Sequence, residues 1–252
     1  MKKLLAILLL VPTFLFAKTI ELNSNNSINF NQAFTPMFVA KKQIEAITTC
    51  AKNVGKDIYV VLYTPGGSIS AGQLFFDTLN ALPCKFHTIT VFAASMGYMS
   101  VQNLGDRYIL PSGILMSHRA SVSGLSGEIG GELDQTIKLL KDNVTELEQQ
   151  ASNRVGISLE KYRSDISDEL WLTAQTAVKT NHADEVVLVK CNEDLMGTYV
   201  ETVNTFFGSF KAEFSNCPII TAPISVRTNN QSDYVKFMNY FTNITKRIKA
   251  TL

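Results

Sequence analysis

The most constraining feature of this sequence is an alternation of short apolar runs with helical segments in its first half. Residues 58–63 are β-branched, aromatic or aliphatic throughout, which is typical of a strand buried on both faces. The turn Thr64-Pro65-Gly66-Gly67 ends this run, and a helix is expected over 69–82. A strand over 87–92 and a helix to about residue 103 repeat the order. Strands that alternate with helices predict an α/β fold with a largely parallel sheet.

The rest of the chain extends this pattern on both sides. The remaining predicted elements are a helix over 36–54, strands over 107–110, 114–117 and 185–189, and the first part of a helix over 171–178. A long helix is predicted from apolar residues that follow one another at spacings of four, three, four and three positions. These residues are Leu133, Ile137, Leu140, Val144 and Leu147. After Cys191 aromatic residues alternate with Asn, Thr and Ser, so residues 192–252 differ in character from the rest.

Composition and charge exclude several classes of protein. The chain has 252 residues, of which 46% are hydrophobic and 18% charged, and this excludes wholesale disorder. Its 23 basic and 22 acidic residues leave a net charge of +1, so nucleic acid is not expected as a partner. The length indicates one large domain, or one domain with an appendage.

The start of the chain has the pattern of a secretory signal. Met1-Lys2-Lys3 is positively charged, residues 4–16 are apolar apart from Pro12 and Thr13, and a polar stretch follows Ala17. The apolar run is shorter than the ~20 residues of a membrane span, although an uncleaved anchor is the alternative. We expect cleavage after about Ala17 and, because the start resembles bacterial signals, a periplasmic or secreted protein.

The cysteines fit such an oxidising compartment. An even number permits two disulfides, and sequence proximity favours Cys50–Cys84 and Cys191–Cys217. Four free buried thiols are the alternative. Because no cysteine stands in a Cys-x-x-Cys or a Cys/His spacing, no metal is expected. No cofactor is expected either.

Three segments carry residues suited to chemistry. The Thr64-Pro65-Gly66-Gly67 turn places bare main-chain amides where they can donate to a developing oxyanion. In Ala93-Ala94-Ser95-Met96-Gly97, Ser95 lies between a strand and a helix, among small residues and at the positive end of the helix dipole. His118 ends a predicted strand and could serve as the base that a nucleophilic serine needs.

Together these segments resemble the ClpP-type serine peptidases of the ClpP/crotonase superfamily. The family pattern stands here as Thr64-Pro65-Gly66-Gly67, Ala94-Ser95-Met96-Gly97, Leu110-Pro111 and Met116-Ser117-His118. The resemblance covers residues 36–190, after an extended segment at 18–35 and before an extension of unknown role at 191–252. It implies a spiral of ββα units with a protruding handle helix at 128–154, and a homo-oligomer.

Carried over residue by residue, the resemblance implies that Ser95 is the nucleophile and His118 the general base. The main-chain N–H groups of Gly67 and Met96 take the positions of the oxyanion hole. The alternative for Ser95 is a helix cap, which is the usual role of a serine at such a position.

The third member of the triad departs from the family pattern. The family has Asp two residues before the aromatic residue that is Trp171 here, and this chain has Glu169. Asp168 is adjacent and is the alternative. Both acids could instead complement the dipole of a helix that starts at Trp171.

The expected function is that of an exported serine peptidase that cleaves peptides or unfolded proteins without ATP. Members of the resembled family work with an ATP-driven unfoldase, and a periplasm holds no ATP pool, so an ATPase partner is not expected. Glu169 and the extension motivate the alternative of a catalytically inactive ClpP-like scaffold or binding protein. A crotonase-like acyl-CoA enzyme disagrees with export, and a Ser-Lys peptidase has no clear base, Lys56 included.

Overall fold

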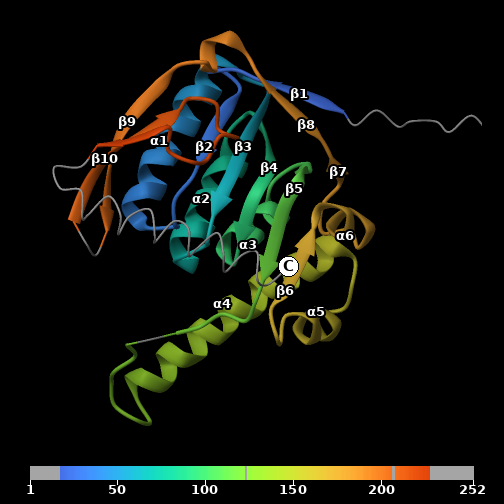
Figure 1. The fold of residues 1–252 in the computed structure, drawn as a ribbon. Helices are drawn as coiled ribbons and strands as arrows, with labels where there is room; N and C mark the ends of the chain where they lie inside the picture. The colour runs from blue at the N-terminus through green and yellow to red at the C-terminus, as the bar shows by residue number, and fades with distance from the viewer. Residues whose placement is uncertain (1–17, 123, 206–207, 228–252) are drawn as a thin grey trace, which may run out of the picture.

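The computed structural model of the protein describes residues 18–122, 124–205 and 208–227. The secretory signal predicted at 1–17 and the last part of the extension, 228–252, lie outside the described residues. The architecture is a central mixed sheet with helices packed on one face and a smaller layer on the other (Figure 1).

The central sheet is largely parallel. Its strands are β2 (Ser27–Phe30), β3 (Asp57–Thr64), β4 (Lys85–Ala94), β5 (Arg107–Ser117), β6 (Leu170–Thr173) and β7 (Glu185–Val186). The order is β2-β3-β4-β5-β6, and β7 pairs with β5 beside this path. The pairs among β2 to β5 are parallel, β6 is antiparallel to β5, and β7 is parallel to it. The α/β fold expected from the sequence is confirmed.

Six helices lie in the described part of the chain. They are α1 (Pro36–Lys52), α2 (Ile69–Ala81), α3 (Met96–Asn103), α4 (Glu132–Val155), α5 (Leu159–Asp165) and α6 (Ala174–Lys179). The side chains of Thr35, Ser68 and Ser158 accept hydrogen bonds from main-chain N–H groups in the first turns of α1, α2 and α5. These N-caps explain why the three helices begin where they do.

Helix α4 projects from the body of the molecule (Figure 1). Its buried residues are confined to its C-terminal half: Leu147, Glu148, Ala151, Ser152 and Val155. Leu139, in the projecting half, is 68% exposed. Gly156 ends the helix in the left-handed conformation that favours glycine. The protruding helix expected over 128–154 is therefore present and begins at Glu132. Within the described residues, no helix combines the length and the apolar character needed to cross a membrane.

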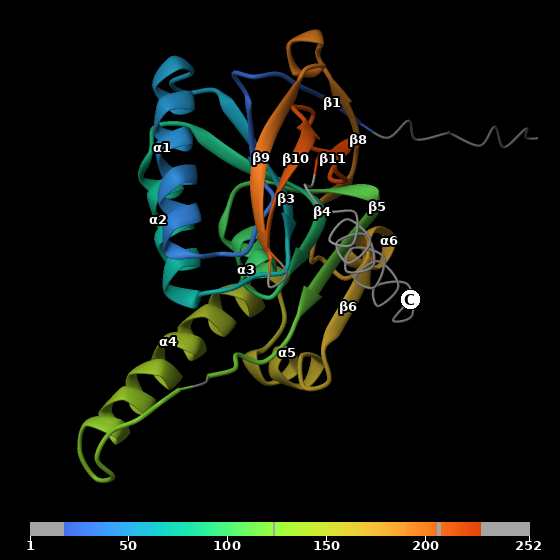
Figure 2. The same ribbon diagram turned by 60° about the vertical axis from the view of Figure 1, so that its left-hand side comes forward.

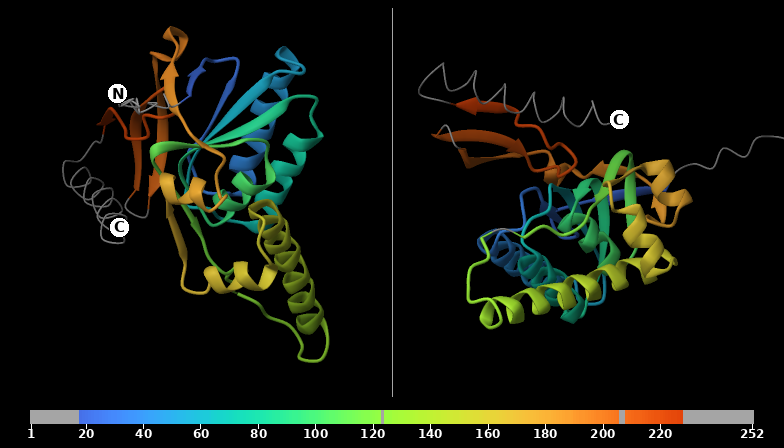
Figure 3. Two further views of the ribbon diagram at one scale, coloured as in Figure 1. Left: turned by 90° about the vertical axis from the view of Figure 1, so that its right-hand side faces the viewer. Right: turned by 90° about the horizontal axis from the view of Figure 1, so that it is seen from below.

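The two faces of β3 enter two different cores, as its period of two requires. Ile58, Val60 and Leu62 lie in the large core formed with the helices. Val61 lies in a smaller core on the opposite face. Figures 2 and 3 show α1 and α2 on one side of the sheet and the C-terminal strands on the other. A strand buried on both faces is what its uninterrupted apolar sequence predicts.

The smaller layer combines the two ends of the described chain. Its elements are β1 (Thr19–Leu22), β8 (Leu188–Cys191), the 3-10 helix η1 (Glu193–Leu195), β9 (Thr198–Thr205), β10 (Gly208–Ser215) and β11 (Ser225–Arg227). β1 pairs in parallel with β8, and β9, β10 and β11 form an antiparallel sheet. Much of the predicted extension is therefore folded as strands.

Two disulfides close loops in this fold. Cys50, near the end of α1, is joined to Cys84, which precedes β4. Cys191, at the end of β8, is joined to Cys217, which follows β10. Both Cys191 and Cys217 lie in the smaller core. This pairing is the one that sequence proximity favours.

Some local predictions are wrong. The strands expected over 107–110 and 114–117 are one strand, β5, whose register against β4 shifts between Ile109 and Ile114. The helix expected to start at Trp171 begins at Ala174, because β6 first pairs with β5 and Thr173 then caps α6. The strand expected over 185–189 is divided, since its first part pairs with β5 and its last part with β1.

Candidate active site

Ser95 lies at the junction between β4 and α3, in a conformation that few residues adopt. Its φ is 55° and its ψ is −116°, and its main-chain N–H donates to the carbonyl of Met116 at 2.9 Å. A non-glycine residue with positive φ costs on the order of 1–3 kcal/mol, and such strain is concentrated at functional sites. Although Ser95 occupies the N-cap position of α3, its side chain makes no capping hydrogen bond. The helix-cap alternative is therefore wrong for the side chain.

The Pro-Gly-Gly turn lies against this serine. Gly66 has a φ of 94° and Gly67 a φ of 145°. A Cβ atom on Gly67 would lie 2.7 Å from the carbonyl oxygen of Phe34, because the segment around Phe34 pairs with the turn. The N–H of Phe34 donates to the carbonyl of Gly66, and the N–H of Ser68 donates to that of Phe34, both at 2.9 Å. Position 67 therefore requires glycine for two reasons: its backbone has a positive φ, and the main chain of Phe34 leaves no room for a Cβ atom.

Two main-chain donors remain beside Ser95. The N–H groups of Gly67 and Met96 donate to no acceptor within the described part of the chain. Met96 begins α3, so its N–H is one of the groups that a helix start leaves without an intrahelical partner. Gly67, Met96 and Ser95 line one cavity. The structure thus brings together the two positions predicted for an oxyanion hole and the predicted nucleophile.

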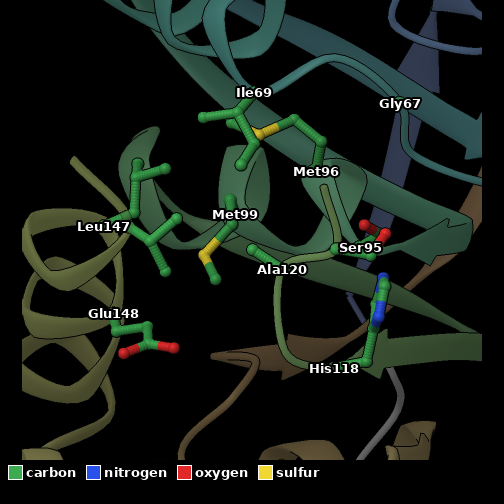
Figure 4. A pocket seen from close by; sticks show the side chains of 11 residues that line it. Gly67, Ile69, Ser95, Met96, Met99, His118, Ala120, Leu147 and Glu148 are labelled. Atoms are coloured by element: carbon green, nitrogen blue, oxygen red, sulfur yellow. The ribbon is translucent and has the colours of Figure 1, made fainter. Parts of the chain in front are cut away.

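His118 follows directly after the last residue of β5. Figure 4 shows its imidazole directed towards Ser95, and both residues line the same cavity. No hydrogen bond joins the two side chains among the described residues. The neighbouring Ser117 is 1% exposed, and its hydroxyl makes a 2.8 Å hydrogen bond with the hydroxyl of Tyr162 on α5. This buried bond fixes the end of β5 from which His118 projects.

The pairing of β5 with β6 ends just before His118 and Glu169. Ser117 pairs with Leu170, and Glu169, the next residue outward from Leu170, leaves the strand with a φ of 66°. Glu169 is therefore one residue nearer than Asp168 to this last pair. However, the Oε2 atom of Glu169 accepts a 3.0 Å hydrogen bond from the indole N–H of Trp171. Within the described residues, neither carboxylate makes a hydrogen bond or an ion pair with His118.

The cavity beside Ser95 has apolar walls and one buried acid. Its volume is about 80 Å³, and Ile69, Met99 and Leu147 supply much of its wall. Glu148, on α4, also lines it and is 7% exposed. Figure 4 shows Glu148 on the far side of the pocket from Ser95 and His118. The sequence predicts the helix that carries Leu147 but assigns no role to Glu148, and its signal was an acid directly after the apolar positions of that helix.

The two other histidines, His87 and His182, are buried in the body of the molecule. His182 is 4% exposed, and its Nδ1 makes a 2.6 Å hydrogen bond with the hydroxyl of Tyr98. Burial, together with the charge of Arg107, lowers the pKa of His182 to about 4. The Nδ1 of His87 accepts a 3.0 Å hydrogen bond from the N–H of Asp106.

Comparison with known proteins identifies relatives for most of the described chain. The model of the Clp protease family matches residues 18–190. The ATP-dependent Clp protease proteolytic subunits of three strains of Streptococcus pneumoniae (Hungary19A-6, CGSP14 and ATCC 700669 / Spain 23F-1) are each 34% identical to this chain over 146 residues. These matches cover 54% of this chain and 71% of each relative. The family match ends before Cys191, so β9, β10 and β11 lie beyond it.

Proposed function

The chain belongs to the Clp protease family, and on this basis we propose that it is an exported serine peptidase that cleaves peptides or unfolded proteins without ATP. The observation that carries the proposal is the position of Ser95. This residue has positive φ at the start of α3, faces His118, and lies beside two main-chain N–H groups without acceptors in the described chain.

The proposed reaction is acyl transfer to Ser95. The hydroxyl of Ser95 attacks the carbonyl carbon of a peptide bond while the imidazole of His118 accepts the hydroxyl proton. The carbonyl oxygen gains negative charge, which the N–H groups of Gly67 and Met96 stabilise. His118 then returns the proton to the leaving amine, and water hydrolyses the acyl-enzyme by the same steps. Catalytic hydrogen bonds commonly tighten only when substrate binds, so Ser95 and His118 need not be bonded beforehand.

Glu169 is the proposed third member of this triad. In support, Glu169 and His118 are the residues next to the last pair of β5 and β6, Ser117 with Leu170, and the proposal requires the carboxylate to leave the indole N–H of Trp171. A carboxylate in that position would fix the tautomer of His118 and stabilise the imidazolium that forms.

The proposal of export depends on the pattern of residues 1–17 and is supported by the disulfides. Both cysteine pairs are joined, and structural disulfides persist in oxidising compartments such as the periplasm. Because a periplasm holds no ATP pool, we propose that the peptidase acts there without an ATPase.

We also propose that the protein acts as a homo-oligomer. Members of the family form oligomers. On the projecting part of this chain, Ile129 is 91% exposed and Leu139 is 68% exposed. Exposed large apolar side chains on a protruding element are a typical contact between subunits. Light scattering after size-exclusion chromatography would give the number of copies.

A fluorophosphonate probe, which reacts only with an activated serine, tests the proposed chemistry. We expect the purified protein to be labelled and to hydrolyse unstructured peptides, and the Ser95→Ala variant to do neither while keeping the same circular dichroism spectrum. Hydrolysis that persists in Ser95→Ala would contradict the proposal.

An inactive scaffold is the second candidate function. It is favoured by the hydrogen bond that holds Glu169 on Trp171 and by the lack of a bond between Ser95 and His118 in the described structure. A well-folded wild-type protein that is neither labelled nor active would support this candidate.

A further inference from the structure

We infer that Glu148 selects the substrate residue whose side chain enters the cavity beside Ser95, and that this side chain has an aliphatic stem and ends in a neutral amide, as in glutamine. The inference rests on the proposed function, since it concerns the residue on the amino side of the cleaved bond. It begins from the shape of the cavity, which joins the candidate nucleophile at one end to a buried carboxylate at the other.

The walls of the cavity favour an apolar stem. Ile69 comes from α2, Met99 from α3, and Leu147 from α4, and the latter two are almost fully buried. Methylene groups of an entering side chain would gain burial against these three residues. With a volume of about 80 Å³, the cavity has room for several water molecules or for one side chain of medium length.

Glu148 supplies an acceptor at the far end. Its side chain is 9% exposed, and its Oε2 accepts a 2.6 Å hydrogen bond from the Nε of Arg163 on α5. Its Oε1 has no hydrogen-bond partner among the described residues, and this oxygen is not fully buried. A cavity lined by this carboxylate therefore offers an open acceptor to whatever enters it.

The surrounding charges argue for a neutral donor. Arg163 neutralises Glu148 through its Nε, and its Nη2 donates to the hydroxyl of Thr145 at 2.9 Å. Arg119 and Lys141 line the groove that adjoins the cavity along α4. A lysine or arginine side chain would enter this positive surrounding at the cost of its own hydration. An amide N–H can donate to Oε1 without that cost.

An aliphatic side chain would pack against the apolar walls of the cavity but could not donate a hydrogen bond to Glu148 at its far end. It would displace water that can donate to Oε1 and, by covering this oxygen, leave it without a donor. A site built around a buried polar group rejects a partner that lacks the matching group, because that group is then left unpaired. We expect glutamine to be preferred over leucine or lysine by about tenfold or more in kcat/KM.

The test is a set of peptides that differ only at the residue on the amino side of the cleaved bond, carrying glutamine, leucine or lysine. The full-length protein should cleave the glutamine peptide fastest. Glu148→Met, which keeps the length of the side chain and removes the acceptor, should reverse the order of glutamine and leucine. Arg163→Met leaves Glu148 without its counter-charge and should raise the relative rate for the lysine peptide. Probe labelling of Ser95 shows that each variant retains its site.

Equal rates for the three peptides, or an order that Glu148→Met leaves unchanged, would overturn the inference while the proposed function stood. A second measurement tests the inference in the case where the proposed peptidase activity is not found. Product peptides that end in glutamine or leucine are titrated against the Ser95→Ala variant, with and without Glu148→Met. Tighter binding of the glutamine peptide, lost in the double variant, would uphold the inference even where the wild-type protein cleaves nothing. Binding without discrimination would refute it.

Discussion

Gly66 packs directly against Ser95, and a Cβ atom at position 66 would lie 2.6 Å from the Cβ of Ser95. It would also lie 2.9 Å from the main-chain nitrogen of Met96. The Gly66→Ala substitution must therefore move the candidate nucleophile and one oxyanion donor together. Because a displacement of 1 Å can cost about 10²-fold in rate, we expect Gly66→Ala to lose at least that much peptidase activity.

Gly55→Ala is the matched control for this substitution. Gly55 also has a left-handed backbone, with a φ of 77°, but a Cβ atom there would meet nothing within 4 Å. The control thus carries the backbone strain, on the order of 1 kcal/mol, without the contact to Ser95. Unfolding in urea measures the loss of stability, and peptide hydrolysis measures the loss of activity. Equal losses of activity in the two variants would contradict the proposed role of the contact.

The sequence allowed the region around Ser95 to be predicted because the constraints there are local. A strand followed by Pro-Gly-Gly, and a second strand followed by Ser95 and a helix, place the two junctions at the same edge of a parallel sheet. The partner of Glu169 could not be predicted in this way. Trp171 competes for that carboxylate only because β6 is a strand, whereas the sequence favoured a helix start there.

The smaller layer was likewise beyond prediction from local patterns. β1 and β8 lie far apart in the sequence, and each is stabilised by pairing with the other. Similarly, the sequence predicts only that Glu148 belongs to a long helix. The fold places its carboxylate at the cavity and beside Arg163. Long-range pairing and burial decide these features, and neither is visible in the spacing of residues.

The choice between Glu169 and Asp168 leads to a second prediction. If Glu169 orients His118 during catalysis, Glu169→Gln should lower kcat about 10²-fold or more, because an amide cannot stabilise the imidazolium. Asp168→Asn is the matched control and should leave kcat within a factor of about two, since Asp168 is one residue further than Glu169 from the last β5–β6 pair, Ser117 with Leu170. Steady-state kinetics on one peptide substrate measures both. A larger loss in Asp168→Asn would assign the role to Asp168 instead.

The disulfide between Cys191 and Cys217 joins the end of β8 to the segment after β10 within the smaller layer. Both cysteines pack in the core that contains Val61, Ile89 and Tyr108. Replacing both cysteines by alanine should lower the free energy of unfolding by about 2–4 kcal/mol. It should also make residues 198–227 the first site of cleavage in limited proteolysis. The Cys50→Ala/Cys84→Ala variant is the control, since it should lose stability without that new cleavage. Unchanged proteolysis in the first variant would show that β1, β8 and the small core hold the layer unaided.

Behind α3, His182 belongs to a buried polar network. Its ring bonds to the hydroxyl of Tyr98, and its carbonyl accepts a 2.9 Å hydrogen bond from the amide of Gln102. Gln102 in turn accepts a 2.8 Å hydrogen bond from Arg107, which is 2% exposed. Burial alone would raise the pKa of Asp184, but the hydrogen bonds from Arg107 lower it below its ordinary value. Protonation of His182 would add a second positive charge beside Arg107.

Stability should therefore fall with pH in a window set by His182. Its pKa is lowered from 6.5 to about 4 on folding, so between these values the unfolded chain binds the proton more readily. The contribution of His182 is fully present above pH 6.5 and is lost as the pH falls to about 4, a total of about 3 kcal/mol. His182→Gln can still bond to Tyr98 but cannot titrate. Urea unfolding at pH 7, 5.5 and 4.5 should show a shallower decline in this variant than in the wild type, and parallel curves would contradict the assignment.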